Sequence, residues 1–170
     1  MKHPIKYCYW AAPKKILAGE YPRTFDEVES QQKIDALVEA GVRVFIDLTT
    51  EFDRLKPYDA LLEKHHALGV RRESFPIADV STPGSTIYTA TILDCIDTAI
   101  NNGETVYIHC WGGIGRTGVI VGCWLARHGE PGQAALDELK RLWQANPKSK
   151  RPQDSPETPT QEQYILGWRE

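Results

Sequence analysis

The ten residues His109-Cys110-Trp111-Gly112-Gly113-Ile114-Gly115-Arg116-Thr117-Gly118 decide how this sequence folds and what it can bind. They follow the apolar run 105–109 (TVYIH), which predicts a buried strand. They lead into residues 116–127, which are apolar almost all round and predict a buried helix. Glycines let a backbone curl so that successive N–H groups converge, and a helix N-terminus adds positive potential at that point. The stretch therefore predicts a cradle for a tetrahedral oxyanion.

Two side chains give this cradle its chemistry. Arg116 carries a planar, permanently charged guanidinium that can bind two phosphate oxygens at once. Cys110 stands in the same loop, where a helix N-terminus and a nearby cation favour the thiolate over the thiol. We therefore expect Cys110 to act as a nucleophile at neutral pH. The expected phosphate-binding residues are Trp111, Gly112, Gly113, Ile114, Gly115 and Arg116.

Residues 113–118 also spell G-x-G-x-x-G, the pattern of a dinucleotide-binding turn. A dinucleotide-binding unit needs a further strand that carries an acidic residue about 20 positions later. Asp137 and Glu138 lie near that distance but fall inside a predicted helix. This interpretation also leaves Cys110 and Arg116 without a purpose, so we reject it.

The order His-Cys, five residues, Arg-Thr-Gly in residues 109–118 matches the signature HCx5R[ST]G, and the chain resembles the protein tyrosine phosphatase superfamily from about residue 42 onward. The loop is similar to that of compact dual-specificity phosphatases of the kinase-associated type, and residues 113–118 also look like those of a classical tyrosine phosphatase. The resemblance implies a phosphocysteine intermediate on Cys110, with the phosphoryl oxygens held by Arg116. It also implies that Thr117 donates a hydrogen bond to the departing sulfur and that His109 orients the loop.

A general acid is expected in the segment 75–83 (FPIADVSTP). An alkoxide or phenoxide leaves slowly unless it is protonated, and general acid catalysis contributes about 10²- to 10⁴-fold. Asp79 lies between a predicted strand and a predicted helix, in a proline-bounded segment that can close over a ligand. The segment resembles the acid loop of the family, so we assign Asp79 as the acid, with a solvated turn residue as the alternative. Asp47, Glu51 and Asp53 are expected to be structural.

Residues 160–164 (TQEQY) resemble in part the glutamine loop of the family, which places water for the hydrolysis of the intermediate. Pro159 occupies the position of the first glutamine, so the match is incomplete. We place Gln163 in the site, with Gln161 as an alternative. A further alternative is that both are ordinary glutamines on a helix surface.

The rest of the chain alternates short apolar runs with helical periodicities, which predicts an α/β fold: one domain with a central, mostly parallel sheet and helices on both faces, as in the tyrosine phosphatases. Thr24 is the expected cap of the first helix, and Val28 is expected on its buried face. We expect residues 1–170 to form a single phosphatase domain, with residues 1–23 extended and residues 160–170 as a C-terminal helix. Strands are expected at 6–10, 15–18, 42–48, 71–75 and 105–109, and helices at 26–40, 58–68, 85–102, 116–127, 131–146 and 160–168.

Composition limits the possible partners. The chain has 170 residues, with 20 basic and 23 acidic residues and a net charge of −3, which gives no electrostatic footprint for nucleic acid or an anionic membrane. No apolar run approaches the length of about 20 residues that spans a bilayer. The four cysteines form no CxxC pair and no metal-ligand spacing. We expect a cytoplasmic monomer that binds no metal, cofactor, nucleic acid or membrane.

Several polar features are given ordinary roles. His65 and His66 are sequence neighbours on a predicted helix, so they do not share a face and are expected at the surface. The basic run 148–151 is interpreted as solvated charge, with the alternative that it lies at the edge of the pocket and attracts an acidic substrate. Cys8 or Cys95 could trap an oxidised Cys110 as a disulfide.

The expected substrate is a phosphorylated protein, with phosphotyrosine and also phosphoserine or phosphothreonine as the phosphate monoester. Residues 111–115 contain no lysine, whereas the inositol-lipid phosphatases of the family that the chain resembles tend to carry basic residues there, so the resemblance disfavours inositol lipids. The sequence also shows no clear phosphotyrosine-recognition motif of the large classical phosphatases. One alternative is a phosphopeptide-binding module without turnover. Another is a sulfurtransferase of the rhodanese kind, which has no use for Arg116 and Thr117 at this spacing.

Overall fold

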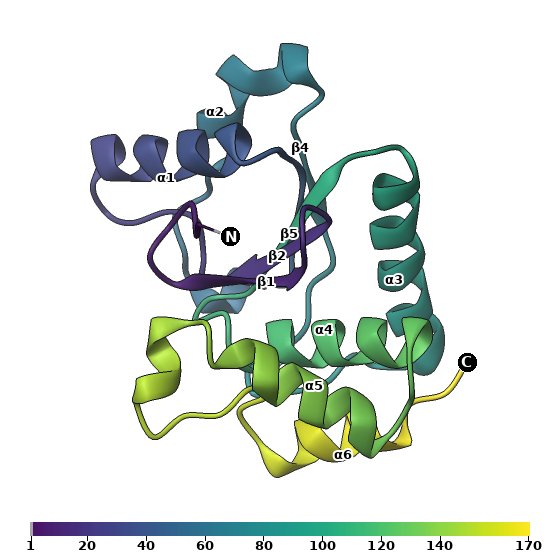
Figure 1. Ribbon diagram of the computed structural model, residues 1–170. Coiled ribbons are helices and arrows are strands. Elements are labelled where there is room, and N and C mark those ends of the chain that lie inside the picture. Colours follow the sequence, from purple (N-terminus) through teal and green to yellow (C-terminus); the bar gives the residue numbers. More distant parts are fainter. Residues whose placement is uncertain (1) are drawn as a thin grey trace.

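The central strand of the protein is β5 (Thr105–His109), and all five of its residues are buried. The computed structural model describes residues 2–170 and contains one five-stranded sheet in the order β1-β2-β5-β3-β4 (Figure 1). Strand β5 pairs in parallel with β2 (Ile16–Gly19) and β3 (Val42–Asp47), and β3 pairs in parallel with β4 (Arg71–Ser74). Only β1 (Cys8–Ala12) runs antiparallel to its neighbour. The sheet is therefore mostly parallel, as expected.

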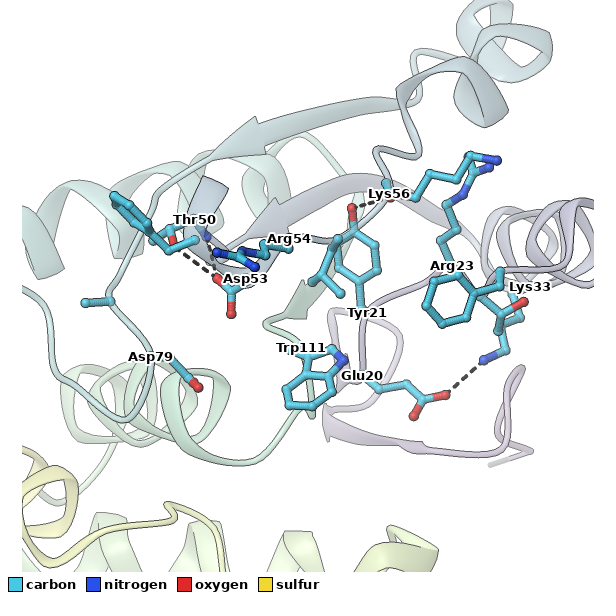
Figure 2. A pocket seen from close by; sticks show the side chains of 15 residues that line it. Glu20, Tyr21, Arg23, Lys33, Thr50, Asp53, Arg54, Lys56, Asp79 and Trp111 are labelled. Atoms are coloured by element: carbon cyan, nitrogen blue, oxygen red, sulfur yellow. Dashed lines mark hydrogen bonds and ion pairs between the residues drawn. The ribbon is translucent and has the colours of Figure 1, made fainter.

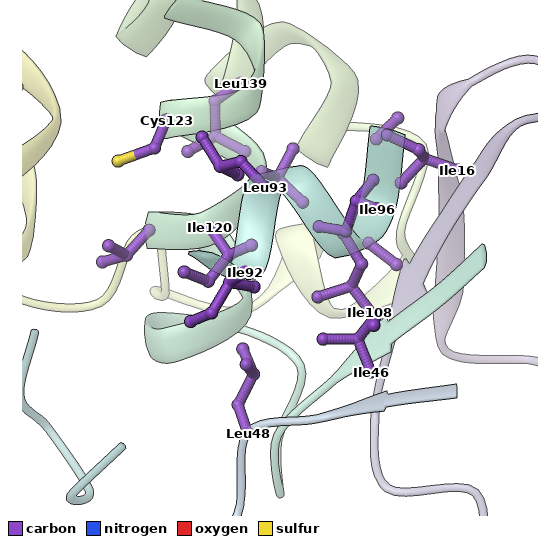
Figure 3. Packing of buried hydrophobic residues seen from close by; sticks show 14 of the residues in the cluster. Ile16, Ile46, Leu48, Ile92, Leu93, Ile96, Ile108, Ile120, Cys123 and Leu139 are labelled. Atoms are coloured by element: carbon purple, nitrogen blue, oxygen red, sulfur yellow. The ribbon is translucent and has the colours of Figure 1, made fainter. Parts of the chain in front are cut away.

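Helices cover both faces of this sheet, because parallel strands need both faces buried. On one face lie α3 (Thr86–Asn101), α4 (Gly115–His128), α5 (Gln133–Trp143) and α6 (Pro159–Gly167). The other face is covered by α1 (Glu27–Glu39) and α2 (Asp59–Leu62) (Figure 1). Figure 3 shows the larger core, where Ile108 of β5 and Ile46 of β3 pack near Ile92 and Ile96 of α3. The predicted α/β fold class is confirmed.

Helix α4 starts directly after the loop that follows β5 and passes through the larger core. Its glycines let other segments approach closely. A Cβ atom on Gly122 would lie 2.5 Å from Cδ1 of Ile165, so α6 rests on α4 at van der Waals distance. A Cβ on Gly118 would overlap Ser155. The sequence of α4 thus brings the C-terminal segment over the start of the helix.

The start of α1 differs from the prediction. Asp26 caps the helix, because its side chain accepts a hydrogen bond from the Glu29 N–H at 2.7 Å, and Thr24 lies before the cap. Val28 is 67% exposed. The buried residues of α1 begin at Ser30, and a residue two positions earlier lies about 200° around the helix from it. The prediction of Val28 as a core residue was therefore wrong.

Short 3₁₀ helices stand between several of these elements, and one of them divides a segment that was expected to be a single helix. Residues 58–68 contain the four-residue helix α2 followed by a 3₁₀ helix, Glu63–Leu68, instead of one continuous helix. The polar stretch after α5 contains a further 3₁₀ helix, Pro147–Lys150. A third short 3₁₀ helix, Glu51–Asp53, follows β3. Within residues 2–170, no helix combines the length and the apolar character needed to cross a bilayer.

Candidate active site

The loop between β5 and α4 surrounds the sulfur of Cys110. The Cys110 side chain is almost fully buried, and the Gly113 N–H donates a hydrogen bond to its Sγ at 3.3 Å. Gly113 has a φ of 73°, and a Cβ there would overlap the backbone of Gly19 and Glu20. A residue with a side chain would therefore have both a strained backbone and a clash at this position. The loop therefore curls around the sulfur, with glycine at the position where the backbone requires it.

Arg116 lies in the first turn of α4 and is 1% exposed. Its Nη1 donates to the Ile77 carbonyl at 3.0 Å, and its two terminal nitrogens bind a carboxylate described below. Its Nε is buried and has no hydrogen-bond partner among residues 2–170. Buried N–H groups are normally paired. The unpaired Nε–H of Arg116, at the end of the glycine-rich loop, is therefore a donor available to an anion.

Asp53 is the carboxylate on Arg116, and the sequence analysis missed it. Its Oδ2 accepts from Arg116 Nη1 at 2.9 Å and its Oδ1 from Nη2 at 2.7 Å, and the Asp53 side chain is 4% exposed. The Thr50 N–H donates to the same carboxylate at 2.7 Å. Burial opposes ionisation of Asp53, but the hydrogen bonds from Arg116 and Thr50 outweigh it and lower the pKa of Asp53. The structural role expected of Asp53 is thus to hold Arg116 in place, a contact that the sequence did not predict.

A signal for Asp53 was available in the topology. Strands β3 and β5 are parallel neighbours, so the segments that follow them leave the sheet at the same edge. Thr50-x-x-Asp53 also forms a capping box, which fixes the carboxylate. An acidic residue in a fixed turn after β3 is thus a candidate partner for a cation after β5.

Asp79 lies on the loop after β4, and its side chain is 58% exposed. Its Oδ1 is 3.0 Å from Arg116 Nη2, so the acid expected from the sequence and the expected phosphate ligand are in contact. The next residue, Val80, has a φ of 51°. A β-branched residue in this region is a backbone outlier, and such strain costs on the order of 1–3 kcal/mol. The acid loop is therefore held in a conformation that the chain would not adopt alone.

His109 is fully buried behind the loop, and burial lowers its pKa, so the ring is neutral near pH 7. Its Nδ1 is 3.2 Å from the Cys110 carbonyl and its Nε2 is 2.7 Å from the Tyr58 hydroxyl. The carbonyl can only accept, so Nδ1 carries the hydrogen and Nε2 accepts from Tyr58. The histidine thus links Tyr58 to the backbone of Cys110.

Thr117, Gln161 and Gln163 differ in their burial and in their hydrogen-bond partners. The Thr117 hydroxyl is buried and has no partner among residues 2–170. Gln161 is fully buried, and its Nε2 donates to the Ser81 carbonyl of the acid loop at 2.9 Å. A Cβ on Gly115 would lie 2.9 Å from the Gln161 amide. Gln163 is exposed, because it lies about 200° around α6 from Gln161. The structure therefore places Gln161, and not the expected Gln163, against residues 111–116. These residues, which are expected to bind phosphate, are called the phosphate loop below.

Lys148 is a buried lysine that contacts the loop after β5. It was expected to be a solvated charge, yet it is 8% exposed. Its Nζ donates to the Gly112 carbonyl at 2.8 Å and lies 3.0 Å from Glu20 Oε2. The basic run 148–151 therefore contributes one buried cation to the back of the phosphate loop.

A cavity of about 620 Å³ opens beside the loop (Figure 2). Asp53, Asp79 and Trp111 are among the residues that line it, and Trp111 belongs to the loop itself. Trp111 is 61% exposed at the rim, where Phe25 and Phe52 are also exposed. The basic residues of the lining are Arg23, Lys33, Arg54 and Lys56. Three carboxylates, Glu20, Asp53 and Asp79, also line the cavity, so its charges are mixed. Its exposed aromatic side chains can pack against a planar group.

The cysteine, histidine and carboxylate side chains of residues 2–170 form neither a metal-ligand cluster nor a disulfide. Among residues 2–170, no group of three or more His, Cys, Asp or Glu side chains is arranged to hold a metal ion. Cys8, Cys95, Cys110 and Cys123 are free thiols. Cys8 belongs to the core on the α1 face of the sheet, whereas Cys110 belongs to the core on the α4 face.

Known proteins have sequences similar to much of this chain. Residues 21–130 match the model of a family described as the DSP-PTPase phosphatase of polymorphic toxin systems. The protein 067L of invertebrate iridescent virus 3, named as a candidate tyrosine phosphatase, is 28% identical over 162 residues, which cover 84% of this chain and 62% of that protein. The dual-specificity protein phosphatase CDC14B of Mus musculus is 28% identical over 126 residues, which cover 70% of this chain and 24% of that protein. The chain thus spans less than two thirds of the length of these relatives.

Solved structures show the same fold. Tk-PTP in its active form superposes with a TM-score of 0.75 at 23% identity and covers 96% of this chain and 98% of that one. Kinase-associated phosphatase with its catalytic cysteine replaced by serine gives a TM-score of 0.72 at 19% identity, with 94% and 90% covered.

Proposed function

The chain belongs to the DSP-PTPase phosphatase family, and from this membership we propose that it removes phosphate from phosphotyrosine, and also from phosphoserine and phosphothreonine, in protein substrates. The observation that carries the proposal is the convergence of three groups on one loop. The Cys110 sulfur accepts from the loop backbone, Arg116 has an unpaired buried N–H, and Asp79 contacts the same arginine. Each group is one that hydrolysis of a phosphate monoester through a thiolate requires.

In the first step, the loop N–H groups and Arg116 bind the three free phosphate oxygens. The Cys110 thiolate attacks phosphorus, an S–P bond forms, and the P–O bond to the substrate breaks. The departing oxygen takes the proton of the Asp79 carboxylic acid. A dephosphorylated side chain and a phosphocysteine result.

In the second step, water attacks the phosphocysteine and the S–P bond breaks. The Asp79 carboxylate takes the proton from water, so the acid is restored. Cys110 leaves as a thiolate, for which the buried and unpaired Thr117 hydroxyl is an available donor. Inorganic phosphate is released, and no cofactor is consumed.

The lining of the cavity supports aromatic over aliphatic phosphate esters. Trp111 and Phe52 expose large parts of their rings beside the loop. The phenyl ring of a phosphotyrosine can pack against such rings, whereas a phosphoserine side chain has no ring to pack there. We therefore expect phosphotyrosine to be the preferred substrate of a protein-tyrosine phosphatase that also accepts phosphoserine and phosphothreonine.

The setting in which the enzyme acts is part of the same proposal. A nucleophilic thiolate must stay reduced, and the four cysteines are free thiols, so we place the protein in the cytoplasm. Residues 1–170 would act as one phosphatase domain, because α5 and α6 pack on α4 around one larger core. We propose that this domain acts as a monomer. The protein substrate that it meets there is phosphorylated.

The test is hydrolysis of para-nitrophenyl phosphate in the presence of a chelator. The wild type should turn over without metal, Cys110→Ser should abolish turnover, and Asp79→Asn should lower kcat by about 10²- to 10⁴-fold. Metal-dependent turnover, or full activity of Cys110→Ser, would contradict the mechanism. Binding of phosphopeptide without wild-type turnover would favour a binding module, and transfer of sulfur from thiosulfate to cyanide would favour a sulfurtransferase.

A further inference from the structure

Lys148 is a buried cation that contacts the backbone of the phosphate loop from behind. It belongs to the 3₁₀ helix Pro147–Lys150, outside the signature loop. Its Nζ donates to the Gly112 carbonyl at 2.8 Å, pairs with Glu20 at 3.0 Å and lies 5.0 Å from the centre of the Tyr7 ring. Holding a lysine in such a place costs desolvation and side-chain entropy, which its contacts must offset.

The peptide bond between Gly112 and Gly113 joins this lysine to the nucleophile. The carbonyl that Lys148 contacts and the N–H that donates to Cys110 Sγ at 3.3 Å belong to this one peptide unit. In a trans peptide the C=O and N–H point in opposite directions. When the ammonium holds the oxygen on one side, it directs the N–H toward the sulfur on the other.

The Gly112–Gly113 unit needs such an external contact. Two consecutive glycines have little conformational preference of their own, and Gly113 is in the left-handed region. The ammonium also polarises the amide, which makes its N–H a stronger donor to a negative sulfur.

We propose that Lys148 is a positioning residue of the active site, which holds the Gly112–Gly113 peptide with its N–H on the Cys110 sulfur and thereby stabilises the thiolate. The proposal rests on the proposed role of Cys110 as a nucleophile. It assigns the residue a function in the reaction although Lys148 touches neither the substrate nor the reacting atoms.

Other charged and titratable groups also face this part of the molecule, and the experiment has to separate them from Lys148. The groups around the thiol are Arg116 with Asp53 and Asp79 bound to it, the neutral His109, and the phenols of Tyr9 and Tyr107. The groups around the ammonium are Glu20, Lys33 paired with Glu20, Tyr7, and Arg151 over the Tyr7 ring.

The experiment measures the rate at which iodoacetamide alkylates Cys110 as a function of pH, with the labelled peptide identified by mass spectrometry. In Lys148→Met the midpoint of this pH profile should rise by about one unit, which is a tenfold loss of thiolate at a given pH. Lys148→Arg should restore most of the wild-type profile, because it also donates to the carbonyl. The matched control is Lys150→Met, an exposed residue of the same 3₁₀ helix, which should leave the profile unchanged.

Glu20→Gln separates positioning from general loosening. This variant removes the carboxylate that offsets the charge of Lys148 but keeps the contact with Gly112, so its midpoint should move to lower pH. A loosened structure would move both variants in the same direction. If Lys148→Met does not fold, as judged by circular dichroism, Glu20→Gln and Lys148→Arg decide the matter.

An unchanged midpoint in folded Lys148→Met, or the same direction of shift in Lys148→Met and Glu20→Gln, would overturn the proposal. If Lys148→Met does not fold, the proposal is overturned when the midpoint of the alkylation profile of Glu20→Gln does not move to lower pH. The readout needs no phosphate ester, so it is independent of the hydrolysis assay. Absence of hydrolysis in the wild type would count against the proposed function, whereas the alkylation profiles report on Lys148.

Discussion

Asp53 and Asp79 bind the same guanidinium but are suited to different roles. Asp53 is buried, contacts both terminal nitrogens of Arg116 and is capped by the Thr50 N–H. Asp79 is largely exposed and touches one nitrogen from a loop. A buried, fully paired carboxylate stays ionised and fixed, whereas an exposed one can exchange protons with the substrate and with water. Asp53 is therefore suited to orient the arginine and Asp79 to transfer the proton.

The change Asp53→Asn tests this division. It keeps the size of the side chain but removes the charge and turns one acceptor into an N–H₂ group that faces the arginine. A hydrogen bond to a charged group contributes about 1.5–3 kcal/mol, so kcat/KM for para-nitrophenyl phosphate should fall by roughly 10- to 100-fold. Inhibition by inorganic phosphate should weaken in parallel. The control is Asp59→Asn, an exposed carboxylate that pairs with Arg72, and its kinetics should match the wild type.

Three of the expected site residues share one property, which is closeness in sequence. His109, Cys110 and Arg116 lie in one short loop whose chemistry can be recognised without a fold. Asp53 reaches Arg116 across 63 positions, and Lys148 reaches Gly112 across 36. Contacts of this kind depend on strand order and helix packing, which a single sequence does not display. The sequence therefore indicated the residues of this loop as a group, but not Asp53 and Lys148, which contact the loop from distant segments.

At the scale of elements, α6 connects the acid loop to the phosphate loop. Its Gln161 donates to the Ser81 carbonyl and lies against Gly115 at the start of α4. The hydroxyl of Tyr164 bonds to Thr89 of α3 at 2.6 Å. The helix can lie this close because Gly122 leaves room for Ile165.

The change Gly122→Ala should separate these two helices. The added methyl group would lie 2.5 Å from a branched side chain that is fully buried and cannot move aside. Overpacking of this kind costs about 1–3 kcal/mol, so Tm should fall by roughly 2 to 12 °C, and Ile165→Val should recover part of the loss. Gly167→Ala is the matched control, since a Cβ there meets no atom within 4 Å. An unchanged Tm in Gly122→Ala would show that α6 does not depend on this contact.

The bounds of an element were predicted well where a strong apolar pattern defines it. They were predicted poorly where packing against another element selects the type of helix. Strands β3 and β5 and helices α3 and α4 lie within a residue or two of their expected bounds, because long apolar runs and clear periodicities define them. The segment 58–68 was expected to be one helix but divides into α2 and a 3₁₀ helix that ends at Gly69, which has a φ of 76°. The competition between α and 3₁₀ geometry depends on packing against α1, which the local sequence does not encode.

For the molecule as a whole, the parallel sheet explains why the site is where it is. The segments after β2, β3, β4 and β5 all leave the sheet at the carboxyl ends of their strands. They supply Glu20, Asp53, Asp79 and Cys110, respectively. Ligands of open α/β sheets bind outside this edge, because the loops meet there and helix N-termini point toward it. The same architecture buries His109 at the end of β5, which makes the stability of the fold depend on pH.

Stability should fall in two steps as the pH is lowered. The pKa of buried His109 is lowered from its ordinary 6.5, so below about pH 6.5 the unfolded chain takes up a proton that the folded chain refuses, and unfolding is favoured. Burial opposes ionisation of Asp35, but Lys64 and His65 donate to it and lower its pKa to about 2. Because the unfolded value is 3.8, the stabilisation from Asp35 is complete above about pH 4 and is lost as the pH falls toward about 2.

Thermal unfolding followed by circular dichroism between pH 8 and pH 2 should resolve both steps. We expect Tm to be highest near pH 7 to 8, to decline below about pH 6.5, and to decline further below about pH 4. Asp35→Asn should weaken only the second decline, since its partners lie between α1 and the 3₁₀ helix Glu63–Leu68 and not at the site. His109→Asn should weaken only the first. A Tm that stays constant from pH 7 to pH 5 in the wild type would show that the folded protein accepts a proton on His109, and the neutral bridge from Tyr58 to the backbone of Cys110 would then have to be abandoned.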